Sequence, residues 1–241
     1  LLARLRHKVD RERAFVQDAA HELRTPLAVV AAQAHVMAHA EAGERAQAHA
    51  LLQQAIARAS HLAQQLLVLA SLDDAQRAAP RAIDVAQVVR QLMAQAAPTA
   101  LARGMDLSLD APDHLVATVD EAAIESIVHN LVDNAVRYAN PGGNVAVSLQ
   151  ACAGRLMLNV QDDGPGITPA DEPHLFDRFW RGAGHDTPGS GLGLAIVQQA
   201  ARRMGGTVAL QNGLPRADGG SGAGFGVSLP WVSETTPPGP A

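Results

Sequence analysis

Apolar residues recur every seven positions along the first part of the chain. One line of them is Val9, Val16, Leu23, Val30 and Met37, and a second line is Ala20, Leu27 and Ala34. Two such lines make the wide apolar stripe of a helix in a bundle, whereas a bare two-stranded coil needs only a narrow seam. The stretch is also rich in alanine and nearly free of glycine and proline. The pattern predicts one long amphipathic helix.

A second helix of the same kind is predicted after Gly43, which marks a turn. Its apolar positions are Leu52, Ala59 and Leu66, with Ile56, Leu62 and Leu69 beside them. The two helices would form a hairpin over residues 1–76. Because two helices alone bury little apolar surface, we expect a homodimer in which two hairpins form an antiparallel four-helix bundle.

The pattern changes after Pro80, where a linker at 77–82 leads into a second domain at 83–231. Helices are predicted from about Asp84 to Arg103, after Asp120 as the N-terminal cap, and from about Leu192 to Met204. Strands are predicted at 105–109, 115–119, 145–151, 155–161, 207–211 and 225–230, with a turn at Ala153 and Gly154. This order predicts helices on one face of a mixed sheet, followed by a disordered tail at 232–241.

Composition narrows the classes of function. The chain has 19 Lys plus Arg against 24 Asp plus Glu, so it lacks the basic footprint of a protein that binds nucleic acid directly. Its one cysteine, Cys152, is expected to be a reduced thiol in the core. No apolar run is long enough to span a membrane, and the chain begins at Leu1, so we expect a fragment whose membrane segment, if any, lies upstream.

The motif around His21 raises a question of chemistry. "HELRT" begins like the zinc-protease pattern H-E-x-x-H, but Thr25 stands where the second histidine belongs, so that metal pair is broken. His35 and His39 lack a third ligand and are expected to be solvated. On the heptad count His21 falls farthest from the apolar seam and should be exposed. Pro26 inside the helix removes a backbone hydrogen bond, at about 3 kcal/mol, which suggests a functional reason for the motif.

Two asparagines mark the helix that Asp120 opens. Asn130 and Asn134 are one turn apart and are expected to face outward, opposite an apolar stripe. Asparagine is a poor helix former, and amide oxygens suit magnesium. Arg137 and Tyr138 extend the same surface.

Three further segments carry polar or glycine-rich chemistry. "QDDGPGI" places Asp162 beside Gly164 and Gly166, where a carboxylate could accept a hydrogen bond from an adenine amine. "FDRFWRG" places Arg178 and Arg181 among aromatic residues. "GSGLGLAIV" runs into a helix and offers backbone amides to phosphate, although no Walker pattern occurs.

These segments together resemble the cytoplasmic kinase core of bacterial two-component sensor histidine kinases. "HELRTP", "NLVDNAVRYA", "DDGPGI", "FDRFWRG" and "GSGLGLAIV" are similar to the family's histidine, asparagine, first glycine, phenylalanine and second glycine boxes, in that order. The segment "SGAGFGVSLP" is less similar to the family's third glycine box, and no nucleotide contact is assigned to it. The resemblance implies a dimeric phosphoacceptor bundle followed by an α/β sandwich that binds ATP, as in gyrase and the Hsp90 chaperones.

The resemblance also implies a role for each matching residue. His21 would accept the γ-phosphoryl group of ATP, Glu22 would act as its base, and Thr25 would serve dephosphorylation of the partner. Magnesium would be held by Asn134 with help from Asn130, and adenine would be read by Asp162. The remaining nucleotide contacts would come from Arg137, Tyr138, Gly164, Gly166, Arg178, Gly189, Gly191, Leu192 and Gly193.

The implied partner is the receiver domain of a response regulator, of the winged-helix transcription-factor group. The full-length protein would lie in the bacterial inner membrane with this part in the cytoplasm. Transfer within a subunit and transfer between subunits both fit, because the handedness of the turn near Gly43 decides between them. A nucleotide-switched ATPase of the same ATP-binding fold and an inactive dimerisation scaffold are the alternatives.

Overall fold

The computed structural model describes the chain apart from residues 1, 40, 74–78, 183–188, 217–218 and 232–241. The chain divides into two compact units, Leu1–Ala70 and Ser71–Ala241. The predicted tail at 232–241 lies outside the described residues, as do positions 77 and 78 of the predicted linker and the side chain of Val9. Among the described residues, no helix is both long enough and apolar enough to cross a lipid bilayer.

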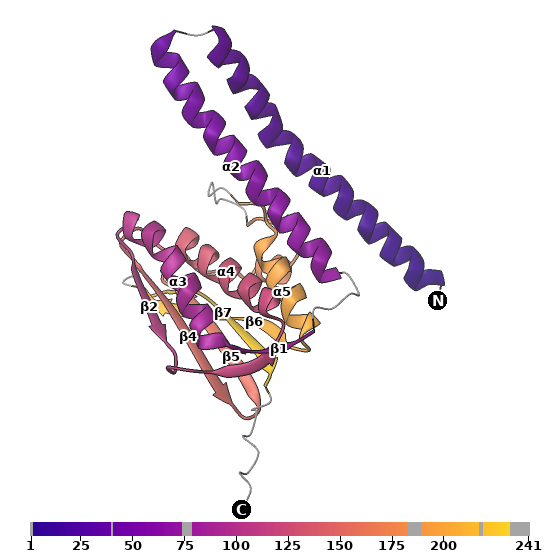
Figure 1. The fold of residues 1–241 in the computed structure, drawn as a ribbon, viewed down its shortest axis with the longest axis vertical. Coiled ribbons are helices and arrows are strands. Elements are labelled where there is room, and N and C mark those ends of the chain that lie inside the picture. The colour runs from indigo at the N-terminus through magenta and orange to yellow at the C-terminus, as the bar shows by residue number, and fades with distance from the viewer. Residues whose placement is uncertain (1, 40, 74–78, 183–188, 217–218, 232–241) are drawn as a thin grey trace, which may run out of the picture. The chain divides into compact units, whose positions relative to one another are not determined.

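The first unit contains the predicted helical hairpin (Figure 1). Helix α1 spans Leu2–His39 and continues through Pro26, and α2 spans Ala42–Asp73. Gly43 lies in the first turn of α2 and not between the helices, so the predicted position of the turn is wrong by a few residues. Gly43 still lies within a few residues of the turn, because a helix tolerates glycine near its end.

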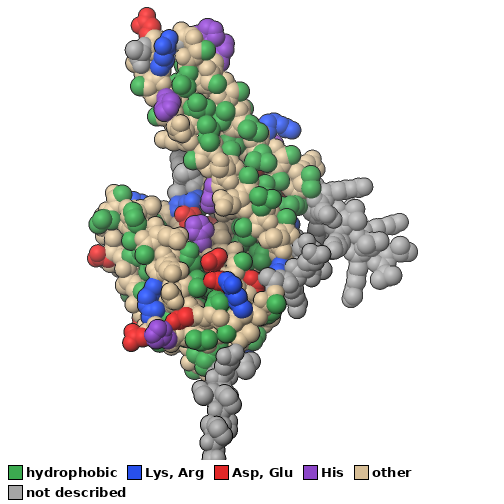
Figure 2. Space-filling model, viewed as in Figure 1, with side chains coloured by type: hydrophobic (Ala, Val, Ile, Leu, Met, Phe, Trp, Pro, Cys, Tyr) green, Lys and Arg blue, Asp and Glu red, His purple; other side chains and the backbone are tan. Residues whose placement is uncertain are grey.

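Burial along α2 follows the heptad. Its most buried apolar residues are Ala48, Ala55, Leu62 and Leu69. Other apolar side chains of the hairpin stay exposed, with Val16 at 60%, Leu27 at 56% and Ile56 at 44%. Apolar side chains gather along the visible face of the hairpin in Figure 2. The single chain therefore leaves part of its predicted seam uncovered.

The second unit is an α/β sandwich in which three helices cover one face of a sheet (Figure 1). The helices are α3 (Val85–Ala102), α4 (Glu121–Tyr138) and α5 (Gly193–Arg203), with a short 3₁₀ turn η1 (Glu172–His174). The strands are β1 (Arg81–Asp84), β2 (Asp106–Asp110), β3 (Val116–Val119), β4 (Asn144–Cys152), β5 (Arg155–Asp162), β6 (Thr207–Pro215) and β7 (Ser221–Pro230).

The main sheet has the strand order β2-β4-β5-β7-β6. Strands β2 and β4 pair in parallel and the other neighbours are antiparallel, so the predicted mixed sheet is confirmed. Strand β1 was not predicted. It pairs antiparallel with β3 in a separate two-stranded sheet, and its four residues, RAID, show no apolar alternation that would mark a strand.

The core lies between the sheet and the helices. Alternate residues of β5, from Leu156 to Val160, are buried against the helical layer. Helix α4 presents the predicted apolar stripe to the sheet: Ile124, Ile127, Val128, Leu131 and Ala135 are all buried. This packing fixes the orientation of α4 and directs the rest of its surface away from the sheet.

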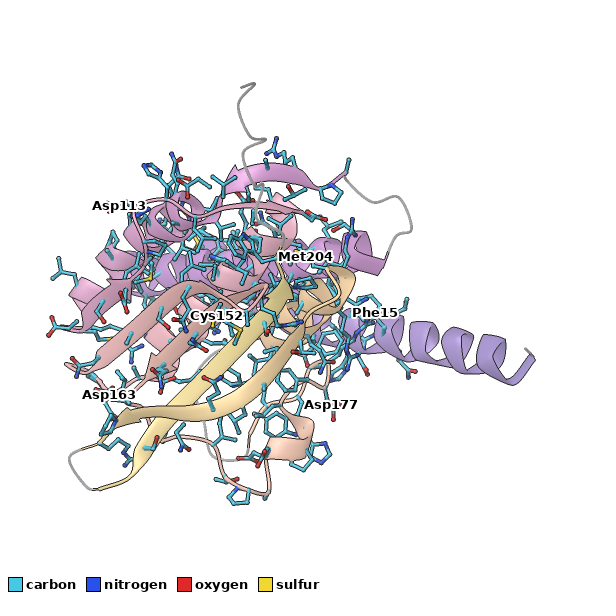
Figure 3. All side chains as sticks on the ribbon, turned by 90° about the horizontal axis from the view of Figure 1, so that it is seen from below. Phe15, Asp113, Cys152, Asp163, Asp177 and Met204 are labelled. Atoms are coloured by element: carbon cyan, nitrogen blue, oxygen red, sulfur yellow. The ribbon has the colours of Figure 1, made fainter. Side chains whose placement is uncertain are left out.

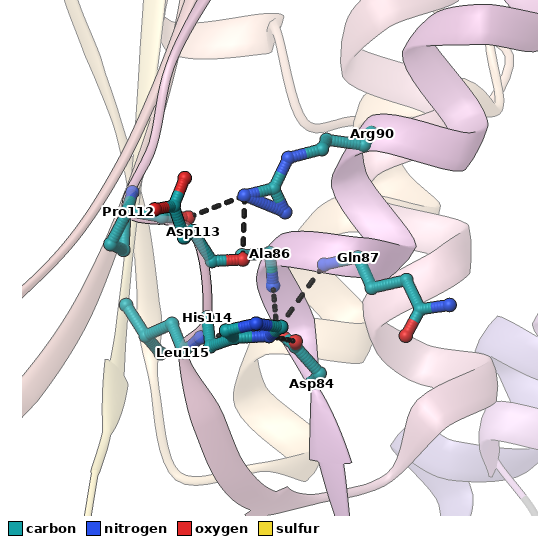
Figure 4. Close-up of polar contacts among 8 residues, drawn as sticks. All are labelled: Asp84, Ala86, Gln87, Arg90, Pro112, Asp113, His114 and Leu115. Atoms are coloured by element: carbon teal, nitrogen blue, oxygen red, sulfur yellow. Dashed lines mark hydrogen bonds and ion pairs between the residues drawn. The ribbon is translucent and has the colours of Figure 1, made fainter.

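Two aspartates cap helices: the cap at Asp120 was predicted, whereas Asp84 was predicted only as the approximate start of its helix. The side chain of Asp120 accepts a hydrogen bond from the Ala123 amide at the start of α4. Asp84 caps α3 by accepting from the amides of Ala86 and Gln87, and it also accepts from the Leu115 amide (Figure 4). Asp84 thus joins the start of α3 to the segment before β3.

The hairpin between β4 and β5 turns where it was predicted to turn. Ala153 and Gly154 both have positive φ, at 50° and 73°, as a tight two-residue connection requires. The prediction that Cys152 is a core thiol is wrong, because it ends β4 next to this turn and is exposed (Figure 3). The alternating burial of β4 stops at Leu149, and the three residues beyond it are exposed.

Candidate functional site

The polar side of α4 carries the asparagine pair. Asn130 is only 7% exposed, and its Nδ2 donates to the Ser126 carbonyl over 2.7 Å. Asn134 is half-buried. The prediction that both amides face outward is therefore wrong for Asn130, which is covered although it lies outside the apolar stripe.

The start of α5 lies beside this pair. A Cβ atom on Gly193 would be 3.2 Å from Asn130 Oδ1 and 3.5 Å from Asn134 Oδ1. Only a residue without a side chain lets the backbone come this close to both amides. The Leu192 side chain is fully buried, so this residue presents only its backbone to the site. The first turn of α5, with its unpaired amides, thus faces two amide oxygens.

Arg137 and Tyr138 lie one turn farther along α4, beside Gly189. A Cβ atom on Gly189 would be 2.9 Å from Arg137 Nη1 and 3.8 Å from the Tyr138 hydroxyl oxygen. The other side of the guanidinium is held by Asp133, with Arg137 Nη2 and Asp133 Oδ2 2.6 Å apart. Sequence reasoning overlooked Asp133, although its spacing of four residues before Arg137 is a signal for such an ion pair.

Asp162 ends β5 as a buried carboxylate that is 4% exposed. Burial raises the pKa of Asp162, although its Oδ1 accepts hydrogen bonds from the amides of Gly164, at 2.9 Å, and Ala223, at 3.2 Å. Sequence reasoning gave no contact to the segment that contains Ala223. A substituent on Gly222 would strike the Asp162 carbonyl, and this close approach explains why a residue without a side chain stands at this position.

The first glycine segment also closes against α4. A Cβ atom on Gly164 would collide with the Tyr138 carbonyl, and one on Gly166, where φ is +77°, would be 2.6 Å from the Ser221 carbonyl oxygen. Asp163, next to them, has a buried Oδ1 without a hydrogen-bond partner in the described part of the chain (Figure 3). The loop after β5 is therefore fitted between the end of α4 and β7.

Residues 179 and 191 meet across the segment 183–188. The Phe179 amide donates to the Gly191 carbonyl over 2.9 Å, and both residues have positive φ, at 63° and 70°. A side chain on Gly191 would strike the Phe179 backbone. Positive φ is unusual for phenylalanine and is typically found where surrounding structure enforces it. Arg178, half-buried, directly precedes this contact.

The first unit presents the histidine motif on α1. His21 is exposed, as predicted, and Thr25, one turn on, is exposed as well, whereas Glu22 is half-buried. The rings of His35 and His39 are tilted by 38° with centroids 4.5 Å apart, and a ring nitrogen of His39 lies 2.9 Å from the His35 carbonyl. The described residues contain no group of three histidine, cysteine or carboxylate side chains that could hold a metal ion.

Two family models match the chain. Residues 11–75 match the His Kinase A (phospho-acceptor) domain, and residues 119–233 match the histidine kinase-, DNA gyrase B- and HSP90-like ATPase. The second model alone would leave the alternative of a gyrase-like or Hsp90-like ATPase open. The first model, which covers His21, decides in favour of a histidine kinase.

The chain belongs to the sensor histidine kinases.

Named relatives agree. The kinase core is 36% identical to the swarming motility regulation sensor protein RssA of Serratia marcescens, over 95% of this chain and 49% of RssA. It is 37% identical to the sensor protein QseC of Escherichia coli K12, over 88% of this chain and 47% of QseC. The kinase core thus spans about half the length of the curated relatives that it matches.

Solved structures share the fold of the kinase core. The Acinetobacter baumannii histidine kinase AdeS matches 88% of this chain and 98% of its own, with a TM-score of 0.68 at 23% identity. The mycobacterial sensor histidine kinase MprB matches 63% of this chain and 97% of its own, with a TM-score of 0.54 at 29% identity. The helical hairpin and the α/β sandwich of the kinase core are therefore those of histidine kinases.

Proposed function

We propose that this kinase core uses ATP and magnesium to phosphorylate itself on His21. The observation that carries the proposal is the approach of the glycine-rich segment to α4. Gly189 and Gly193 both lie so close to α4 that a side chain would meet Arg137 at one position and the asparagine amides at the other. Phosphate ligands, metal ligands and a helix N-terminus thus share one surface.

The chemical types of these residues suit the binding of a nucleotide with magnesium. The amide oxygens of Asn134 and Asn130 are hard ligands suited to magnesium, which would neutralise charge on the phosphates. Arg137 and the amides from Gly189 to Gly193, together with Arg178, would hold the phosphates, and Tyr138 would line the nucleotide. Gly164 and Gly166 let the loop after Asp162 pass close to α4 and β7, so that the carboxylate can accept from the adenine amine.

His21 supplies the acceptor. A neutral imidazole has a free ring nitrogen that can act as a nucleophile. That nitrogen attacks the γ-phosphorus, the bond to the leaving ADP oxygen breaks, and Glu22 accepts the proton from the other ring nitrogen. Glu22 directly follows His21 in α1. Positioning and charge neutralisation supply most of the catalysis in such a transfer.

The phosphoryl group would then pass to an aspartate of a response regulator, of the winged-helix group. We propose that the core also stimulates removal of that phosphate with the help of Thr25. The uncovered apolar side chains of the hairpin, among them Val16, Leu27 and Ile56, support a homodimeric four-helix bundle. In the full-length protein this part would lie in the cytoplasm, beneath the bacterial inner membrane.

The deciding experiment is incubation of the purified chain with magnesium and γ-labelled ATP. A protein label that is lost in acid and kept in base is expected, because a phosphohistidine has that stability. Free phosphate without a protein label would indicate an ATPase of the same fold, and neither product would indicate a scaffold.

Two variants assign the parts of the reaction. His21→Ala should abolish the label and keep ATP binding, because acceptor and nucleotide site lie in different units. Asn134→Ala should lose magnesium-dependent ATP binding while the chain stays folded, because the apolar stripe of α4 is untouched. An acid-labile label on His21→Ala, or unchanged ATP affinity of Asn134→Ala in magnesium, would contradict the assignment.

A further inference from the structure

Arg103 lies outside every motif of the kinase core and ends helix α3. Its own amide donates to the Ala100 carbonyl at 3.0 Å, and its carbonyl accepts from the Gly142 amide at 3.0 Å. The backbone of Arg103 is thereby fixed to the loop that follows α4.

The side chain of Arg103 reaches the end of α4. Its guanidinium donates to the carbonyls of Val136, of Arg137 at 2.9 Å and of Ala139 at 3.2 Å. The last carbonyls of a helix lack partners inside the helix and form its negative end. The flat guanidinium, with several donors in a fixed fork, suits them better than a single ammonium group would. Arg103 therefore acts as a cap for α4 supplied by another helix.

The turn that Arg103 holds is the turn that faces the nucleotide segments. It carries the side chains of Arg137 and Tyr138 beside Gly189, and its Tyr138 carbonyl lies against Gly164. Asn140, just beyond it, donates to the Asp163 carbonyl over 2.6 Å. A small shift of this turn would displace Arg137 and Tyr138 together.

We propose that Arg103 is a positioning residue for the nucleotide site, which acts on the phosphates through Arg137 without touching them. This inference rests on the proposed function. It assigns to α3 a part in nucleotide binding, in addition to its part in the core.

Replacement of Arg103 tests the proposal. Arg103→Met keeps the length of the side chain and removes its donors, and we expect about tenfold weaker ATP binding. In an Arg137→Met background the same replacement should weaken ATP binding by clearly less than tenfold, because Arg137 is gone and only the displacement of Tyr138 remains. An equal loss in both backgrounds, or no loss in the wild-type background, would overturn the proposal.

The same helix offers a matched control. Arg90 of α3 also donates to backbone carbonyls, those of Pro112 at 2.6 Å and Asp113 at 2.7 Å (Figure 4). Those carbonyls belong to the segment between β2 and β3 and not to α4. Arg90→Met should therefore leave ATP affinity within about twofold of wild type. A tenfold loss in this control as well would mean that any damage to α3 weakens binding, and would overturn the specific role of Arg103.

A spectroscopic test does not need nucleotide. Tyr138 is the one tyrosine of the chain, so labelling with 3-fluorotyrosine gives a single ¹⁹F signal from the turn that Arg103 holds. Arg103→Met should shift or broaden this signal, and Arg90→Met should not. If the wild-type chain bound no ATP, the proposed function would fail, and the ¹⁹F signal would still decide whether Arg103 places the turn.

Arg103→Lys covers the case in which Arg103→Met does not fold. Lysine keeps the positive charge at the helix end but has a single ammonium group in place of the fork. We expect a folded chain with ATP affinity between that of wild type and that of Arg103→Met, and a ¹⁹F signal displaced from wild type. If Arg103→Lys had the ¹⁹F signal and the ATP affinity of wild type, the forked guanidinium would not be required at this position.

Discussion

Asp162, the residue proposed to read adenine, is buried in a way that disfavours its charged form. Because burial raises its pKa, ionised Asp162 opposes folding at neutral pH, and its protonation at low pH favours the folded state. The amide oxygen of an asparagine could still accept from the Gly164 and Ala223 amides, without a charge. Stability alone therefore gives no reason for a carboxylate at this position, whereas the proposed contact with adenine does.

We therefore expect Asp162→Asn to lose ATP binding while its free energy of unfolding at pH 7 equals or exceeds that of wild type. The difference from wild type should shrink as pH falls toward about 4, where the wild-type carboxyl becomes protonated even when unfolded. Urea unfolding followed by tryptophan fluorescence measures it, since Trp180 and Trp231 both lie in the second unit. A variant clearly less stable than wild type at pH 7 would assign Asp162 a structural role.

Thr25 should separate the two activities proposed for the core, autophosphorylation and stimulation of regulator dephosphorylation. It is exposed one turn beyond His21, so its hydroxyl can orient water beside the imidazole, where a regulator's phosphoaspartate would lie. Thr25→Ala should keep much of the self-labelling and lose about tenfold or more of its stimulation of regulator dephosphorylation. Decay of purified phosphorylated regulator with ADP and either chain measures this. Equal decay rates would remove Thr25 from the mechanism.

At the level of elements, the start of α3 depends on one carboxylate. Burial raises the pKa of Asp84, but hydrogen bonds from the Leu115 amide, the His114 ring and the Gln87 amide outweigh it and hold the pKa below its ordinary value. The stabilisation is present above the unfolded pKa of about 3.9 and is lost as pH falls through the lower folded value.

Asp84→Ala should accordingly lower the free energy of unfolding by about 1–2 kcal/mol at pH 7, and by less at pH 3. Urea unfolding at both values measures the change. Asp113→Ala is the control, since only the backbone carbonyl of Asp113 is used, by Arg90, and its side chain is exposed (Figure 4). A loss for Asp84→Ala that stays constant down to pH 3 would contradict the part of the ionised carboxylate.

The elements themselves were largely predictable, because their patterns are local. The heptads gave the hairpin, Asp84 and Asp120 marked two helix starts, and Ala153 and Gly154 between two strand-like runs marked the turn of β4 and β5. Strand β1 escaped notice, and β6 and β7 are longer than predicted. Each of these failures concerns backbone pairing with a distant strand, which leaves little trace in the residues of the strand itself.

For the whole molecule, the uncovered seam of the hairpin predicts assembly. Leu27 lies on the predicted seam and is 56% exposed in the single chain. Leu27→Glu would place a charge in a four-helix core, and we expect a monomer at micromolar concentration with ATP binding retained. Light scattering after size exclusion measures this. Leu101→Glu is the control, since Leu101 is 77% exposed on α3 and should leave the dimer intact. If the Leu27→Glu variant remained a dimer, the predicted seam would not be the dimer interface.

The candidate site was only partly predictable, because motifs name residues and not their contacts. The predicted residues Asn130, Asn134, Arg137 and Tyr138 do come together with Gly189 and Gly193. Ala223 and Arg103 were missed, because their bonds join positions 61 and 33–36 residues apart. A single sequence carries no local signal for such pairs, and the burial of Asn130 beneath α5 was hidden for the same reason.

The hydrogen bond from the Ala223 amide to Asp162 makes this amide of β7 a reporter of the state of the carboxylate. That amide donates to the Asp162 carboxylate over 3.2 Å. In hydrogen–deuterium exchange it should open only when β7 separates from β5, so its proton should persist among the slowest of the sheet. Its resonance frequency should also follow the charge on Asp162 as pH is varied. An ¹⁵N spectrum of the chain without nucleotide would thus report the ionisation of the Asp162 carboxylate from the neighbouring strand.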